Sequence, residues 1–346
     1  MATYTLPGSN NFPNTEVVGE SWREKQIAAA IGGKPRLDKE VEQTLPALLV
    51  PEPDNPYDPN AISVRVRGHV VGYLSKEDAA RYRDPIHRIA ASGHEATTTA
   101  RIWAVVRKSY DNQGKARFFS SVRVALGEPH LLVPSNGRPP SAHSVLPWGG
   151  AVQVLGEEDH FDVLFNHVPK EGHGLAIVTL HKDVQRLKNG TEKPFIEVRI
   201  DGERIGQLSP TTSAHLLPVV EHLEAAGLHP AAWATVKGSS LAAQVTVQAA
   251  KATEVSDEWL HGSPSEFPAL VAEAARYSVP PAYVEEETPD RNASSTSPSK
   301  GTTPGTRGSA AGGSGCLGLI ALIPGILTVA LVRRAVPKHR ARKPSE

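Results

Sequence analysis

The chain repeats part of itself, and this repeat limits the folds that its 346 residues can adopt. Shifting the sequence by 134 residues aligns 62–102 with 196–236 without a gap, and eleven of these 41 positions are identical. Gly72 matches Gly206 in this alignment, and Ser75 matches Ser209. Two tandem copies of one unit of about 110 residues explain the length better than one large domain does.

Each copy shows the pattern of a strand-rich unit. Apolar residues alternate over 62–66 and over 196–200, which is typical of a half-buried strand. A turn containing glycine follows in both copies, and a second strand ends at a leucine, so the pattern predicts a β-hairpin. Pairs of aliphatic residues at 17–18 and 154–155 mark a first strand in each copy.

One helix is expected after the hairpin of each copy. Ser75 and Ser209 are residues of the kind that cap a helix N-terminus, and Gly93 and Gly227 are suited to end the helix. Another strand follows the helix. We therefore predict an α+β fold that is mainly β, with two tandem small OB-like barrels, each with a helix, then a disordered linker and a C-terminal membrane helix.

Changes in composition divide the chain into seven parts. Pro and Gly interrupt every periodic pattern between the copies, and Ser, Thr, Pro and Gly dominate the stretch before the C-terminal apolar run. The predicted parts are a first barrel over 1–130, an interdomain linker over 131–149, a second, degenerate barrel over 150–262, a short helix within 263–284, a disordered linker over 285–314, a membrane segment over 315–333 and a basic tail over 334–346.

The run from Cys316 to Val332 contains no charged residue, and six Lys/Arg with one Glu follow it. It predicts a membrane segment of about 25 Å, shorter than a typical hydrocarbon core, with Pro324 near its middle. A shallow hairpin, an ordinary tail anchor and a buried helix of a soluble domain remain open. The N-terminus has no pattern of an export signal, so we expect the barrels at the cytoplasmic side of the cell membrane.

Three stretches of the first copy carry a resemblance to a known family: VVGES at 17–21, EPDNPYDPNAI at 52–62 and VGYLSK at 71–76. Over about 14–126 the chain resembles the HIRAN domain, and about 150–252 looks like a diverged second copy. That family is associated with DNA repair and remodelling helicases and also occurs apart from them in bacterial proteins. The resemblance implies an OB-like barrel that holds single-stranded DNA at a 3′ end.

The resemblance also implies roles for individual residues. Tyr57 is expected to stack on a terminal base, which contributes roughly 1–3 kcal/mol and tolerates any base. Asp58 is expected to accept a hydrogen bond from the terminal hydroxyl. Because a carboxylate repels phosphate, it would favour a free hydroxyl over a strand that continues. Lys76 corresponds to a basic residue that meets phosphate, and the remaining members of this predicted site are Trp22, Asn55 and Tyr73.

The same loop has a purely structural interpretation. Asp58 and Asn60 are residues that shape turns by bonding their own backbone, and the neighbouring prolines set the chain direction. The resemblance also has departures, because Ser21 replaces a residue that is basic in some members and Asp54 adds negative charge. Both interpretations of the loop remain open.

Basic residues cluster with aromatic residues near the end of the first copy. Arg101, Arg107 and Lys108 are the members that we assign to an electrostatic groove, with a solvated hairpin as the alternative. The second copy differs, since residues 150–260 carry 9 Lys/Arg against 15 Asp/Glu and its loop at 187–194 has neither Tyr nor Asp. Its net charge of −6 opposes phosphate.

We expect a protein without enzymatic activity, without a cofactor and without a metal site. The chain has no Gly-rich phosphate-binding loop, and a single Cys excludes a zinc finger based on cysteines. Glu52, Asp54 and Asp58 form only a weak match to the metal cluster of a nuclease. The favoured function is a non-enzymatic module that binds a single-stranded DNA end and is tethered to a membrane. The alternative is a membrane-associated adaptor for an unknown protein partner, without nucleic-acid binding.

Overall fold

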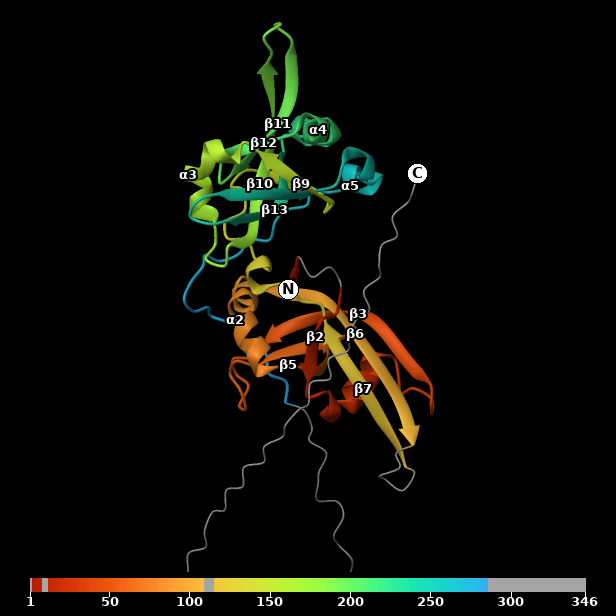
Figure 1. Cartoon of the computed structure of the whole chain (residues 1–346). Helices are drawn as coiled ribbons and strands as arrows, with labels where there is room; N and C mark the ends of the chain where they lie inside the picture. Colours follow the sequence, from red (N-terminus) through yellow and green to blue (C-terminus); the bar gives the residue numbers. More distant parts are fainter. Residues whose placement is uncertain (1, 8–11, 109–114, 286–346) are drawn as a thin grey trace, which may run out of the picture. The chain divides into compact units, whose positions relative to one another are not determined.

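The computed structural model describes residues 2–7, 12–108 and 115–285 (Figure 1). These residues belong to one compact unit that extends to Glu286. The predicted membrane segment over 315–333, the basic tail and nearly all of the linker over 285–314 lie outside the described residues. Within the described part, no helix combines the length and the apolar character needed to cross a membrane.

The first copy folds into a closed barrel. Its strands are β1 (Ala2–Thr5), β2 (Thr15–Val18), β3 (Glu40–Pro51), β4 (Ile62–Val66), β5 (His69–Leu74), β6 (His94–Lys108) and β7 (Ala116–Val124). They pair in the order β1-β6-β3-β4-β5-β2-β7. A further pairing of β6 with β7 closes six strands into a barrel, and β1 adds to β6 in parallel.

The second copy repeats this topology in a separate sheet. Its strands are β8 (His143–Val145), β9 (Gly150–Leu155), β10 (His173–Arg186), β11 (Glu192–Ile200), β12 (Glu203–Leu208), β13 (His229–Gly238) and β14 (Ala243–Ala249). They pair in the order β10-β11-β12-β9-β14-β13-β8, and β10 also pairs with β13. The expectation of two tandem OB-like barrels is therefore confirmed at the level of the fold.

Each barrel carries one long helix, α2 (Lys76–Ala91) in the first and α4 (Pro210–Ala225) in the second. The shorter helices are α1 (Glu24–Ala30), α3 (Phe161–Leu164) and α5 (Asp257–His261). Single 3-10 turns are η1 (Glu20–Trp22), η3 (Pro129–Leu131), η4 (Glu157–His160), η5 (Phe165–His167) and η6 (Ala252–Glu254).

Both long helices begin and end where the sequence predicts. The Ser75 hydroxyl accepts the backbone N–H of Asp78 at 3.0 Å, and Ser209 accepts that of Thr212 at 3.2 Å. These bonds satisfy N–H groups that have no partner within the helix. Gly93 follows α2 with φ +77° and its counterpart in the repeat follows α4 with φ +75°, the left-handed conformation that ends helices.

Gly72 and Gly206 match in the repeat because both stand where strands meet closely. A Cβ at Gly72 would lie 2.7 Å from the Val18 carbonyl oxygen, and a Cβ at Gly206 would lie 2.6 Å from that of Leu155. In each barrel this close approach joins the hairpin to the first barrel strand, β2 or β9. Any side chain there would push the two strands apart, so the barrel closes only around glycine.

Two segments differ from the sequence prediction. The interdomain linker over 131–149 contains strand β8, and Leu132 and Leu146 within it are buried. The segment over 263–284, where a helix was predicted, contains neither helix nor strand. Pro268 lacks a backbone N–H, and the Val271 backbone donates to the Ser92 hydroxyl and accepts from Arg88, so its hydrogen bonds go to the first barrel.

Candidate functional site

The loop over 52–61, which joins β3 to β4, is organised around a buried carboxylate. Glu52 has 0% exposure, and its Oε1 accepts from the Arg65 guanidinium at 2.9 Å. Its Oε2 accepts from the Asn55 amide at 2.9 Å and from the Tyr73 hydroxyl at 3.1 Å. Buried charges need such partners, since desolvation is otherwise costly. The loop is therefore anchored to both strands of the β4–β5 hairpin.

Side chains within the loop shape its turn. The Asn55 Oδ1 accepts the backbone N–H of Tyr57 at 3.0 Å, and the Asp58 Oδ1 accepts that of Asn60 at 2.9 Å. The structural interpretation is thus correct for the side chain of Asp58, and the side chain of Asn55 shapes the turn in the same way. The fold does not bury Tyr57, whose side chain is 85% exposed. An exposed tyrosine on a fixed turn is suited to contact a ligand.

A hollow of about 290 Å³ lies beside this loop. It gathers five of the nine residues predicted for the site, namely Asn55, Tyr57, Asp58, Tyr73 and Lys76. The other residues that line it are Val18, Arg23, Ala61, Leu74, Ala79 and Tyr283. The loop, strand β5 and the start of α2 therefore converge on one surface.

Two cationic side chains face this hollow. Lys76 is exposed in the first turn of α2. The positive end of the helix dipole lies there too, so both would attract a bound anion. The Arg23 guanidinium lies 4.9 Å from the centre of the Tyr73 ring, within the range of a cation–π contact. The hollow thus combines aromatic rings, a carboxylate and positive charge.

The four other predicted residues lie elsewhere. Trp22 is 79% exposed on η1 and does not line the hollow. Arg101 donates two hydrogen bonds to Glu42, at 2.9 and 2.7 Å, and this pairing raises the pKa of Arg101 and lowers the pKa of Glu42. Arg107 pairs with the Glu40 carboxylate on the same strand pair. These two arginines are therefore already neutralised by β3.

Lys108 lies at the exposed end of β6, where β6 pairs with β7. Arg107 is opposite Arg117 in this pairing, and the Arg117 guanidinium lies 5.5 Å from the Phe119 ring. The basic and aromatic residues of the predicted groove therefore share this hairpin, away from the hollow. They form a second surface of mixed charge, because Glu40 also belongs to it.

Next to β7 lies Glu20, a carboxylate in an unfavourable environment. Burial, with a smaller contribution from Glu16, raises the pKa of Glu20 to about 7. Its Oε2 is buried and has no hydrogen-bond partner among the described residues. Together with Arg117 and Phe119 it lines a smaller hollow of about 180 Å³. Near neutral pH this carboxyl group changes charge.

The three acidic residues considered as a nuclease cluster face different partners. Glu52 binds Arg65 in the interior, whereas Asp58 holds its own turn. Asp54 accepts the backbone N–H groups of Ala282 at 2.8 Å and of Tyr283 at 3.0 Å, and these bonds lower its pKa. Three carboxylates with separate partners do not converge on one metal ion.

The second barrel lacks the counterpart of this loop. Its β10–β11 hairpin turns tightly at 187–191 with Gly190 at φ +80° and extends away from the barrel as a ribbon (Figure 1). Arg199, which matches Arg65 in the repeat, pairs with Glu197 instead of with a loop residue. The repeated arginine is thus kept, but the aromatic turn that it supports in the first barrel is absent.

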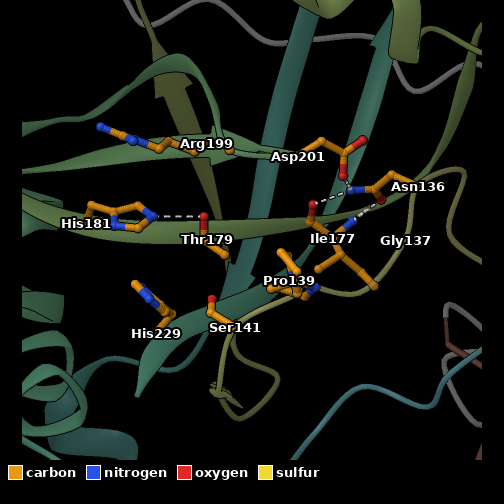
Figure 2. Close-up of a pocket in the computed structure, with 12 residues that line it drawn as sticks. Asn136, Gly137, Pro139, Ser141, Ile177, Thr179, His181, Arg199, Asp201 and His229 are labelled. Carbon is orange, nitrogen blue, oxygen red and sulfur yellow. Dashed lines mark hydrogen bonds between the residues drawn. The ribbon is translucent and has the colours of Figure 1, made fainter. Parts of the chain in front are cut away.

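The second barrel has a hollow of its own, of about 270 Å³, between β10, β11 and the linker (Figure 2). Asn136 from the linker exchanges two hydrogen bonds with the Ile177 backbone and donates to Asp201. His181 forms a hydrogen bond with the Thr179 hydroxyl. The pKa of His181 is lowered, mainly because the ring is buried. Figure 2 shows the Asn136 amide directed at Ile177 and Asp201, so this side chain fastens the linker to the barrel.

These features define a closed six-stranded barrel whose β3–β4 loop presents an exposed tyrosine beside a carboxylate. Residues 30–104 match the family model of the HIRAN domain, so the first barrel is a HIRAN domain, as the motifs predicted. No curated protein and no solved structure matched the chain. The second barrel shares the topology, and its membership in the family stays a prediction.

Two parts of the site, the Glu52–Arg65 ion pair and Tyr283, were not predicted from the sequence. The Glu52–Arg65 ion pair had one signal, since Arg65 recurs as Arg199 in the repeat and an arginine on a half-buried strand needs a partner. Tyr283 had none, because it lies far along the chain and outside any motif. Only the fold places it at the hollow.

Proposed function

We propose that the first barrel binds single-stranded nucleic acid and takes a free 3′ end into the hollow beside Tyr57. The observation that carries the proposal is the convergence of Tyr57, Asp58 and Lys76 on one surface of a HIRAN domain. A ring, a carboxylate and a cation are the groups that recognise a base, a sugar hydroxyl and a phosphate.

Each group has a distinct role in this proposal. The exposed ring of Tyr57 offers a face to a terminal base, which every base can use. Lys76 attracts the phosphate that precedes the terminal sugar, helped by the positive end of α2. The second oxygen of Asp58 accepts from the terminal hydroxyl, and its charge disfavours a phosphate at that position.

The test is fluorescence anisotropy of the protein with an oligothymidine labelled at its 5′ end and carrying a free 3′ hydroxyl. Wild type should bind with an affinity that falls as salt rises, and Tyr57→Ala should weaken binding about tenfold. Circular dichroism of the variant should be unchanged, since Tyr57 is almost fully exposed. Equal affinity of both proteins would remove the hollow as the binding site.

The proposed role is binding without catalysis. Incubation of the labelled strand with Mg²⁺ or Mn²⁺ should leave it intact, and cleavage that depends on the metal would instead make the protein a nuclease. The carboxylates with separate partners support the non-enzymatic proposal, because metal-assisted hydrolysis needs several ligands around one ion.

We also propose that the protein is held at the cytoplasmic face of the cell membrane. The support is the uncharged run from Cys316 to Val332 with the basic residues that follow it. Fractionation of cells should place the full chain with membranes and a truncation after Ser314 in the soluble fraction. Membrane retention of the truncated chain would assign the anchor to another part.

A further inference from the structure

The segment over 263–285 connects the second barrel to the hollow of the first. Phe267 anchors it, with 2% exposure and a ring 4.7 Å from that of Trp233. Further along, the Ala269 carbonyl contacts His94 at 3.1 Å, and the Val271 backbone bonds to Ser92 at 2.9 Å. The segment therefore follows a fixed path over the first barrel, with contacts from side chains and backbone alike.

The last described residues of this segment dock beside the β3–β4 loop, where Figure 1 draws them in blue near β5. Asp54 accepts the backbone N–H groups of Ala282 and Tyr283, and Arg65 donates to the Ala282 carbonyl at 2.5 Å. Arg65 also binds Glu52, so the loop and the segment share one arginine. The Tyr283 side chain is half-buried and lines the hollow.

The segment forms a wall of the hollow and does not fill it. The hollow keeps about 290 Å³ with Tyr283 in place, close to the lower end of ligand pockets, which hold roughly 300–1000 Å³. Three tyrosines then border the same space: Tyr57, Tyr73 and Tyr283. A blocking segment would instead occupy the space that a nucleobase needs.

The docked segment also hydrogen-bonds a carboxylate next to the hollow. Asp54 carries a carboxylate that would repel an incoming phosphate. Two backbone N–H groups of the segment bind this carboxylate and satisfy it as the first turn of a helix satisfies an anion. The aromatic wall and the compensated charge both favour a nucleic-acid end.

We infer that the nucleic-acid site is composite: the segment that follows the second barrel supplies Tyr283 as an aromatic wall of the hollow in the HIRAN domain. This inference rests on the proposed function and adds to it a residue 179 positions beyond the end of the matched region at 104. It also gives the second barrel a role, since that barrel anchors the segment through Phe267.

The experiment compares full-length variants by anisotropy with the oligothymidine labelled at its 5′ end. Tyr283→Ala should weaken binding about tenfold, as expected for loss of one stacking contact, and Tyr283→Phe should stay within about threefold of wild type because it keeps the ring. Tyr277→Ala is the matched control. It removes a tyrosine from the same segment that does not line the hollow, and it should bind like wild type.

Hydrogen exchange at the amides of 282 and 283 checks that the segment stays docked in each variant. Wild-type affinity of Tyr283→Ala would overturn the inference, and tighter binding would do so in favour of a segment that blocks the hollow. If wild type and Tyr57→Ala both fail to bind, the proposed function fails and the composite site with it. Binding lost in Tyr57→Ala but kept in Tyr283→Ala refutes the composite site alone.

Discussion

The Arg65 guanidinium donates to the Glu52 carboxylate at 2.9 Å, and this ion pair fixes the loop that presents Tyr57. Glu52 is fully buried and also accepts from Asn55 and Tyr73. Removing Glu52 would leave the partly buried Arg65 guanidinium without its carboxylate and two further donors without their acceptor. The loop and the barrel therefore depend on one another.

Glu52→Ala should lower the free energy of unfolding by about 3 kcal/mol, because removing one partner of a buried ion pair leaves the other charge uncompensated. Denaturant titration of the full chain, followed by circular dichroism, measures this loss. The control is Glu42→Ala, which removes an exposed partner of Arg101 and should leave stability unchanged. Similar losses in both variants would show that Glu52 has no special structural role.

Gly72→Ala and Gly206→Ala should each destabilise their barrel by roughly 2–4 kcal/mol, since the new Cβ meets a carbonyl oxygen of the neighbouring strand. Gly150→Ala is a matched control in β9, where a Cβ has no atom within 4 Å. Thermal unfolding should show a clear loss for the first two variants and little change for the control. Tolerance of alanine at Gly72 or Gly206 would contradict the close approach of the strands.

Local features of this fold were predictable, and distant contacts were not. The capping serines and the final glycines of α2 and α4 act within a few residues, so short patterns reveal them. The same holds for the turn around Asn55 and Asp58, which depends on bonds between near neighbours. Arg101 looked available for phosphate because nothing in the local sequence shows that β3 brings Glu42 beside it.

Tyr283 illustrates the limit more sharply. Its backbone bonds to Asp54 across 229 positions, and neither residue carries a pattern that points to the other. The sequence predicted a short helix within 263–284, but the chain there forms no helix. Leu270 packs against the core of the first barrel whereas Val271 is exposed, so the apolar residues of this stretch do not form one buried face.

Glu20 makes stability depend on pH. Its folded pKa of about 7 lies above its ordinary value of 4.5, so the folded state favours the protonated form and wild type loses stability as pH rises from about 4.5 to about 7. Glu20→Gln should therefore be more stable than wild type by about 1 kcal/mol at pH 8, after allowance for solvent screening, and equal to it at pH 4. Denaturant titrations at both pH values test the difference, and a gain that is independent of pH would assign it to packing.

The salt dependence of oligothymidine binding should show which of the two barrels contacts the strand. Lys76→Ala should weaken binding of the oligothymidine and reduce the slope of log Kd against log salt by about 0.7, the value for one phosphate contact on a single strand. Lys188→Ala removes an exposed cation from the β10–β11 turn of the second barrel and should change neither quantity. An equal change in both variants would show that net charge, and not the hollow, attracts the strand.

We predict that recognition of the strand end depends on Asp58. Wild type should bind an oligothymidine with a free 3′ hydroxyl about tenfold more tightly than one with a 3′ phosphate, because the carboxylate accepts from the hydroxyl and repels the phosphate. Asp58→Asn keeps an oxygen for the Asn60 N–H, so the turn should persist while the charge is lost. This variant should bind the two strands with affinities within about threefold of each other. If it discriminates as strongly as wild type, Asp58 serves the turn alone and the preference for a free end has another source.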